Sequence, residues 1–330
     1  MYTTLSNKSN AFKHSVINTM DELKSTIMDL EAQPNLRFRG VNEAKYKMLT
    51  SLQRMCPSKE LTKQKEYLTR LLSEVRGSTA VIDFFKNNKI PINDLSCLSL
   101  MQHYGLPTPL LDFSTDIRIA LAFAAHKMKT SSGLEDIDNY ASLYVFDTKA
   151  EYEVGIPIQQ MMNNDEYKGA RYSYQSCGIP FNNSLLQNID EFSQWNDLAE
   201  IELVFIEYQQ FAPGFVTLSG QKLNLSNPNL DMQKGCFLLN LFDGEMPLEE
   251  NWNMRTKESR DQFWSNPNSG TKFNCKGMHT KEKLTCYDIK KDILSDWARI
   301  NAIPLFNKNP ESQCVENQLL KIKETLKTSL

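Results

Sequence analysis

The sequence lacks the features that define several large classes of protein. No apolar run approaches the ~18 residues that a membrane-spanning helix needs, and the densest run, 203–206, is bounded by Glu202 and Glu207. The first residues hold no apolar stretch of the kind found in a secretory signal. The seven cysteines form no closely spaced pair, which argues against a disulfide framework. These absences predict a cytoplasmic protein that does not enter a membrane.

The sequence also lacks a large net charge and the common catalytic motifs. Lys and Arg number 37 against 40 Asp and Glu, so the net charge of −3 gives no strong nucleic-acid signal. The Walker pattern, the dinucleotide glycine fingerprint and the Gly-x-Ser-x-Gly elbow do not occur, and the sequence therefore requires no cofactor. Cys275, His279 and Cys286 hint at zinc but lack a fourth nearby ligand, so we expect no metal site.

The composition is that of a globular protein with a packed core. Hydrophobic residues make up 41% of the chain and charged residues 23%. A length of 330 residues corresponds to about two domains at roughly 150 residues each. Helical patterns at both ends of the chain surround a strand-rich middle, however. The pattern therefore predicts one elaborated α+β domain, with a mixed or antiparallel central sheet and flanking helices.

Hydrophobic periodicity and turn residues place the elements along the chain. Helices are expected at 11–33, 59–87 with a break at Gly77, 93–104, 117–125, 290–301 and 310–326. Strands are expected at 36–40, 141–146, 201–208, 214–218 and 235–241. Polar surface excursions are expected at 149–198 and 243–280. We expect an N-terminal helical part over 1–35, a central domain over 36–245, and a C-terminal extension over 246–330 whose helices pack on the same core.

The first segment that local structure explains poorly is Phe38-Arg39-Gly40. An arginine at the end of an apolar strand is costly unless it is paired or meets an anion. Two interpretations stay open. Arg39 is either a structural arginine, paired with Asp112, or a binding residue for an anionic ligand.

The second such segment is 102–115, Gln-His-Tyr-Gly-Leu-Pro-Thr-Pro-Leu-Leu-Asp-Phe-Ser-Thr. It places a histidine, an aspartate and hydroxyl groups around a proline-stiffened loop, beside a helix N-terminus that favours anions. Turn and cap chemistry accounts for Gly105, Ser114 and Thr115. The roles of His103 and Asp112 stay open, because a histidine in the last turn of a helix is either a dipole-stabilised cation or a functional group.

These two segments resemble the FRG-domain family, which is named for its Phe-Arg-Gly motif. The resemblance covers 38–40, 49–54, 102–115 and 120–124, and a weaker match at 233–238 is similar to the family's late Gln-x-Gly-x-Phe strand. Pro109 stands where the family usually has arginine, which removes a cation from the loop. Such domains occur largely in bacteria and phages, some of them in settings that suggest defence.

A weaker resemblance, to an ADP-ribosyltransferase core, implies a chemistry. The order of an Arg-Gly strand, a Ser-Thr segment before an alanine-rich helix, and a late polar strand is similar in both. The resemblance implies contacts to NAD from Arg39, Gly40, Ser114 and Thr115, with NAD as substrate. For an enzyme of this kind we expect catalytic roles for a small polar set: His103, Asp112, Gln233 and Glu202.

Two functional hypotheses therefore remain. The first is an enzyme that performs ADP-ribosyl transfer or NAD-glycosidic cleavage, in which Glu202 or Glu207 supplies the carboxylate that Gln233 cannot. Glu202 alternates with Ile201 and Leu203, which also fits a solvent-facing residue of a strand. The second is a non-enzymatic effector domain that binds a small anionic ligand, a nucleotide or a protein partner, with a structural Arg/His/Asp network.

Overall fold

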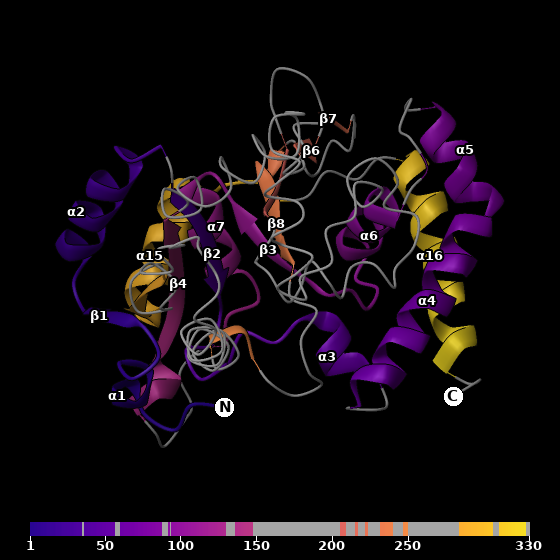
Figure 1. Ribbon diagram of the computed structural model, residues 1–330. Coiled ribbons are helices and arrows are strands. Elements are labelled where there is room, and N and C mark those ends of the chain that lie inside the picture. The colour runs from indigo at the N-terminus through magenta and orange to yellow at the C-terminus, as the bar shows by residue number, and fades with distance from the viewer. Residues whose placement is uncertain are drawn as a thin grey trace, which may run out of the picture. The chain divides into compact units, whose positions relative to one another are not determined.

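The computed structural model describes residues 1–34, 36–56, 60–87, 92, 94–129, 136–147, 205–208, 215–216, 222–223, 232–239, 247–249, 284–305 and 310–327 (Figure 1). These residues group into two compact units that alternate along the chain. The first unit draws on 1–48, 113–156 and 247–305, and the second on 49–112, 157–246 and 306–330. Each unit is therefore assembled from segments that are distant in sequence.

The first unit is built on a mixed sheet. Its strands are β1 (Lys13–Ile17), β2 (Leu36–Val41), β4 (Tyr140–Asp147) and β9 (Leu284–Lys290), in the order β1-β9-β4-β2. β1 and β9 are parallel, whereas β4 is antiparallel to both β9 and β2. The end of β3 (Leu110–Ser114) joins this sheet through the pair Phe38↔Ser114. The predicted α+β fold class with a mixed sheet is confirmed.

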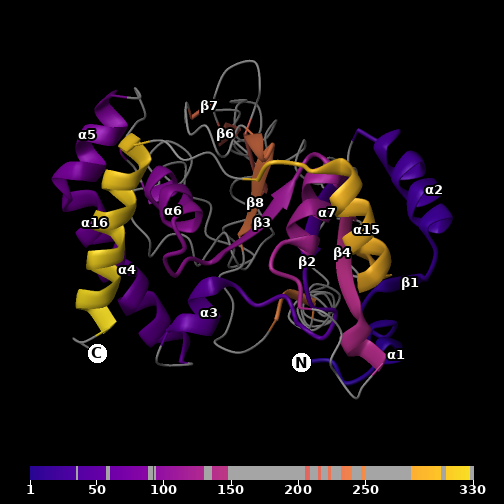
Figure 2. The same cartoon turned by 180° about the vertical axis from the view of Figure 1, so that it is seen from behind.

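The helices of this unit are α1 (Leu5–Lys8), α2 (Met20–Glu31), α7 (Ile117–Ala125) and α15 (Lys291–Asn301), with the short 3-10 helix η1 (Asp136–Asn139). α7 and α15 lie beside β4 and β2 in both views (Figures 1 and 2). Their apolar residues meet one face of the sheet in a common core, which includes Phe38, Leu121, Val145 and Trp297. The opposite face of the sheet carries most of the polar side chains discussed below.

The predicted helix at 11–33 is wrong in its first half. Residues 13–17 form strand β1, and the helix begins only at Met20. Thr19 caps it, in a capping box with Glu22 that sets the start of the helix independently of the apolar residues before it. Helical spacing of Phe12 and Val16 was misleading, because Phe12 is buried outside any helix and Val16 lies on the strand.

The second unit is largely helical in its described part. It contains α3 (Ser51–Met55), α4 (Leu61–Gly77), α5 (Thr79–Asn87), α6 (Asp94–His103) and α16 (Pro310–Lys327). α16 runs alongside α4 and α5 (Figure 2), and together these helices enclose a core that includes Leu71, Phe85 and Leu319. The short strands β8 (Gly235–Leu239), β5 (Phe205–Tyr208), β6 (Phe215–Val216) and β7 (Lys222–Leu223) pair antiparallel in that order.

Most of the predicted elements that fall on described residues are confirmed. The break at Gly77 separates α4 from α5, and the predicted helix 117–125 coincides with α7. α15 contributes to the core of the first unit and α16 to that of the second, while the domain boundaries after residues 35 and 245 stay a prediction. The excursion at 149–198 and most of 243–280 lie outside the described residues. No helix in the described ranges is long and apolar enough to cross a membrane.

Candidate functional site

Arg39 lies on the face of the first sheet that is turned away from α7 and α15. Directly opposite residues on paired strands point to the same face, and successive residues alternate between faces. Phe38 is opposite Val145 and belongs to the helix-covered core, so Arg39 points the other way. Arg39 on β2 is opposite Tyr144 on β4. Cys286 on β9 is in turn opposite both Tyr144 and His14 on β1. These four side chains form one row across β2, β4, β9 and β1.

Gly40, which follows Arg39, is required by packing. A Cβ added there would lie 1.8 Å from the carbonyl oxygen of Ala120 and 2.7 Å from the backbone nitrogen of Ala124. β2 therefore touches the backbone of α7, whose alanines allow the close approach. The glycine of the Phe-Arg-Gly motif is explained by this contact without any ligand, and its predicted role in cofactor binding stays a prediction.

Ser114 and Thr115 lie where β3 leads into α7. The buried Ser114 hydroxyl oxygen accepts from the backbone N–H of Asp116 at 3.1 Å, and Asp116 caps the helix by accepting from the N–H of Arg118 at 2.8 Å. Because Ser114 is opposite Phe38, its side chain is on the helix-covered face. The structure thus pairs the strands of Arg39 and Ser114 but sends the two side chains to opposite faces. Thr115, at the bend after the strand, is exposed.

The loop after α6 in the second unit, residues 104–109, is held by a compact hydrogen-bond network. Ser51 donates its hydroxyl to the carbonyl oxygens of Leu106 and Thr108 and accepts from the Thr108 N–H at 2.9 Å. The Gln102 amide oxygen accepts from the Thr108 hydroxyl, and its nitrogen donates to Asp112 Oδ2 at 2.8 Å. Gln102 thereby ties α6 to both sides of the loop.

The turn after α6 brings His103 into an apolar setting. Gly105 has a φ of +70°, which favours glycine, and its carbonyl accepts from Lys323 Nζ at 2.9 Å. The His103 ring meets Tyr104 edge-on, with centroids 5.0 Å apart. Burial lowers the pKa of His103 to about 4, although the Asp112 carboxylate works in the opposite direction. At neutral pH His103 is an uncharged imidazole, which argues against the interpretation as a dipole-stabilised cation.

The remaining predicted catalytic residues are only partly described. Gln233 is half-buried and precedes Lys234, which has a φ of 44°, and strand β8. Glu202 lies outside the described residues, whereas Glu207 is on β5 opposite Cys236. Arg39 belongs to the first unit and His103, Asp112 and Gln233 to the second. The predicted Arg39–Asp112 pair and the convergence of these side chains therefore stay predictions.

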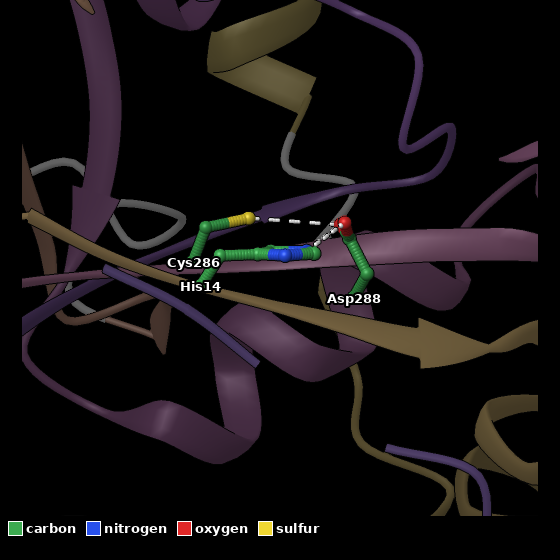
Figure 3. A group of neighbouring side chains, drawn as sticks. All are labelled: His14, Cys286 and Asp288. Carbon is green, nitrogen blue, oxygen red and sulfur yellow. Dashed lines mark hydrogen bonds and ion pairs between the residues drawn. The ribbon is translucent and has the colours of Figure 1, made fainter. Parts of the chain in front are cut away.

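Sequence reasoning missed a second polar group, formed by His14, Cys286 and Asp288 (Figure 3). One potential ligand atom from each residue lies within 4.8 Å of the other two. His14 and Asp288 are 274 positions apart in the sequence, so the group forms no local motif. Strand β9, which carries Cys286 and Asp288, was also not predicted. Cys275 and His279, considered above beside Cys286, lie outside the described residues.

Comparison with known families supports the resemblance drawn from the motifs. The model of the FRG domain matches residues 34–133, a range that holds the Phe-Arg-Gly strand, the loop after α6 and helix α7. The chain therefore contains an FRG domain, as predicted. Searches of the curated proteins and of the solved structures found no match.

Proposed function

We propose that this FRG-domain protein binds an anionic nucleotide such as NAD through Arg39 and catalyses ADP-ribosyl transfer or NAD-glycosidic cleavage. The observation that supports this proposal is the place of Arg39. It stands at the centre of β2, on the sheet face opposite the helices, in a row with the hydroxyl of Tyr144 and the imidazole of His14. A planar guanidinium offers two parallel N–H donors to a pyrophosphate, and a sheet strand holds it rigidly.

The proposed chemistry breaks the bond between ribose C1′ and the nicotinamide nitrogen. The bonding electron pair leaves with nicotinamide, and the ribosyl carbon becomes an oxocarbenium-like centre. Water or an acceptor side chain then forms the new bond to C1′ and loses a proton. A carboxylate close to the ribose stabilises the developing positive charge. The sequence predicts Glu202 or Glu207 for this role.

The test is incubation of the purified full chain with NAD, followed by measurement of nicotinamide release. Arg39→Ala should lower the rate by about 100-fold or more, because it removes the charged contact to the substrate. Arg299→Ala is the matched control, since this arginine is 78% exposed on α15 and forms an ion pair with Asp296 of the same helix at 3.0 Å. Unfolding midpoints of both variants should equal that of the wild type. No release by the wild type, with acceptor proteins present, would overturn the proposal.

The second candidate is a non-enzymatic effector domain that binds a ligand or partner. It is favoured by the roles found for several motif residues: Gly40 packs on α7, Ser114 supports the helix cap, and Gln102 joins Thr108 to Asp112. Under this proposal NAD or another nucleotide binds without turnover. Calorimetric titration of the same two variants separates the candidates, because binding that depends on Arg39 but releases no nicotinamide supports the second.

The resemblance also suggests a defence or toxin setting, which belongs to the proposal. Expression in bacteria should slow growth or limit phage plaques with the wild type and not with Arg39→Ala. Equal effects of wild type and variant would show that any such activity does not use this arginine.

A further inference from the structure

Lys8 is a fully buried lysine whose ammonium group lies in a polar cluster on the first sheet. Its Nζ is 2.5 Å from Asp288 Oδ1 and 2.7 Å from the hydroxyl oxygen of Ser142, and all three residues have no exposed surface. The ring of Tyr144 has its centroid 5.2 Å from the same nitrogen, and that of Tyr2 has its centroid at 5.8 Å. A carboxylate, a hydroxyl and two aromatic faces therefore surround one ammonium group, a combination suited to a cation.

The carboxylate at the centre of this cluster is held on both oxygens. Ser142 donates to Asp288 Oδ1 at 2.5 Å, and His14 Nε2 lies 2.7 Å from Oδ2. Burial alone would raise the pKa of Asp288, but the contacts with His14, Lys8 and Ser142 hold it below its ordinary value. The Asp288 carboxylate is thus ionised, and residues of the neighbouring strands β1 and β4 hold it in place on the sheet.

The same cluster contains the potential metal ligands of Figure 3, but its geometry suits an ammonium better than a metal. A divalent cation would have to displace Lys8 from Asp288 Oδ1. Burial also raises the pKa of the Cys286 thiol, which keeps the sulfur protonated, whereas a metal needs the thiolate. Cys286 instead lies with its sulfur 3.6 Å from Asp288 Oδ1, as a weak donor.

Lys8 reaches the sheet from a short N-terminal segment, residues 1–12, which we call the N-terminal cap. Its buried side chains are Tyr2, Lys8 and Phe12, and its helix α1 has only four residues. Tyr2 donates to Glu249 at 2.7 Å, and the Phe12 ring contacts Tyr144 with centroids 5.3 Å apart. Most of the other side chains of the cap are exposed. Tyr2 also donates its backbone N–H to the carbonyl oxygen of Lys45 at 2.8 Å. Because Lys8 supplies the buried ion pair of the cap, a competitor for the position of its ammonium group would weaken the hold of the cap on the sheet.

We propose that this face of the sheet carries a binding site for primary alkylammonium groups, and that Lys8 is its built-in occupant. A lysine side chain or small alkylammonium ion that enters the site releases the N-terminal cap. The site lies on the same face as Arg39, because Tyr144 is opposite both Arg39 and Cys286. This inference does not depend on the proposed nucleotide chemistry.

The first test empties the site. Lys8→Ala should unfold at a lower temperature than the wild type, and n-butylammonium chloride should restore its melting temperature in a saturable manner. Tetramethylammonium, which has no N–H donor, and sodium chloride at equal ionic strength should not. Lys291→Ala is the matched control, since Lys291 is also buried in an ion pair, with Glu43 at 3.0 Å. If n-butylammonium raised the melting temperatures of both variants equally, it would be filling any cavity beside a carboxylate, and the proposal would be overturned.

The second test uses the wild type and does not require that any variant folds. Hydrogen exchange of the N-terminal cap, followed by mass spectrometry, should become several-fold faster with n-butylammonium, while exchange of α2 stays constant. Unchanged exchange of the cap at saturating ammonium contradicts its displacement. Addition of Co²⁺ completes the test, because a thiolate-to-cobalt absorption band in the wild type would identify a metal site in place of the ammonium site.

Discussion

Replacement of Gly40 by alanine tests whether the glycine of the Phe-Arg-Gly motif serves packing. The added Cβ would lie 1.8 Å from Ala120 O, 2.7 Å from Ala124 N and 2.8 Å from Ala120 C. All three atoms belong to the backbone of α7, so no side-chain rotation relieves the collision. β2 and α7 must separate by roughly 1 Å, which disturbs the core that Ala120 and Ala124 share with Phe38.

The size of the effect follows from the geometry. Overpacking of a well-packed core costs about 1–3 kcal/mol, and occasionally more. A backbone collision lies at the upper end of this range, so Gly40→Ala should lower the free energy of unfolding by about 3 kcal/mol or more. This loss is a large part of the roughly 5–15 kcal/mol that stabilises an ordinary protein. It should occur with or without NAD, because its cause is the contact with α7.

Urea-induced unfolding followed by circular dichroism measures this effect, with two other glycines as matched controls. A Cβ at Gly77 would have no neighbour within 4 Å, so Gly77→Ala should stabilise α4 by about 0.5 kcal/mol. Gly105 has equal space but a φ of +70°, so Gly105→Ala should cost about 1–2 kcal/mol through backbone strain. A Gly40→Ala variant whose stability is within about 1 kcal/mol of the wild type would refute the packing explanation.

Two further predictions concern the loop of the second unit. The pKa of His103 is lower in the folded protein than in the unfolded chain, so the unfolded chain binds a proton more readily. The free energy of unfolding should therefore fall as the pH drops from 6.5 towards about 4. His103→Gln should reduce this dependence of stability on pH. An NMR titration of the ring should show a midpoint near 4, and a midpoint near 6.5 would contradict the burial of the imidazole. Gln102→Ala removes the donor to Asp112 and the acceptor of Thr108 and should cost about 1–2 kcal/mol in the same urea assay. An unchanged unfolding midpoint would show that Gln102 does not hold the loop.

Local signals in the sequence predicted a large part of the fold. α7 was predicted with its correct limits because its residues are apolar except for Arg118 and polar residues precede it at the cap. The break at Gly77 and the end of α6 before Gly105 were likewise predicted from single glycines, and Gly105 has the φ of +70° that favours glycine. These features depend on a few neighbouring residues, so no knowledge of distant segments was needed.

Strands β1 and β9 were missed because their signal is tertiary. β9 mixes Cys286 and Asp288 with apolar residues, and a buried aspartate does not resemble a strand interior until its partners are known. Those partners, Lys8 and His14, come from the other end of the chain. β1 was included in the predicted N-terminal helix for the same reason, since its backbone pairs with β9 at the other end of the chain.

The candidate site shows the same division. The motif residues Arg39, Gly40, His103 and Asp112 were found from the sequence, and the match of the FRG domain to residues 34–133 confirms the family resemblance. Their individual roles were not readable in this way. The register of β2 with β3 separates the faces of Arg39 and Ser114, and the closeness of α7 to β2 explains Gly40.

The absence of the common cofactor motifs, the limits of α7 and the FRG motifs follow from the amino-acid sequence alone, because each depends on residues close together along the chain. Three features follow only from contacts between distant segments: His103 is neutral, Gly40 packs against α7, and Lys8 is enclosed by Asp288, Ser142 and two tyrosines. The physical reason is that burial and pairing set the behaviour of charged groups, and both arise here from segments distant in sequence.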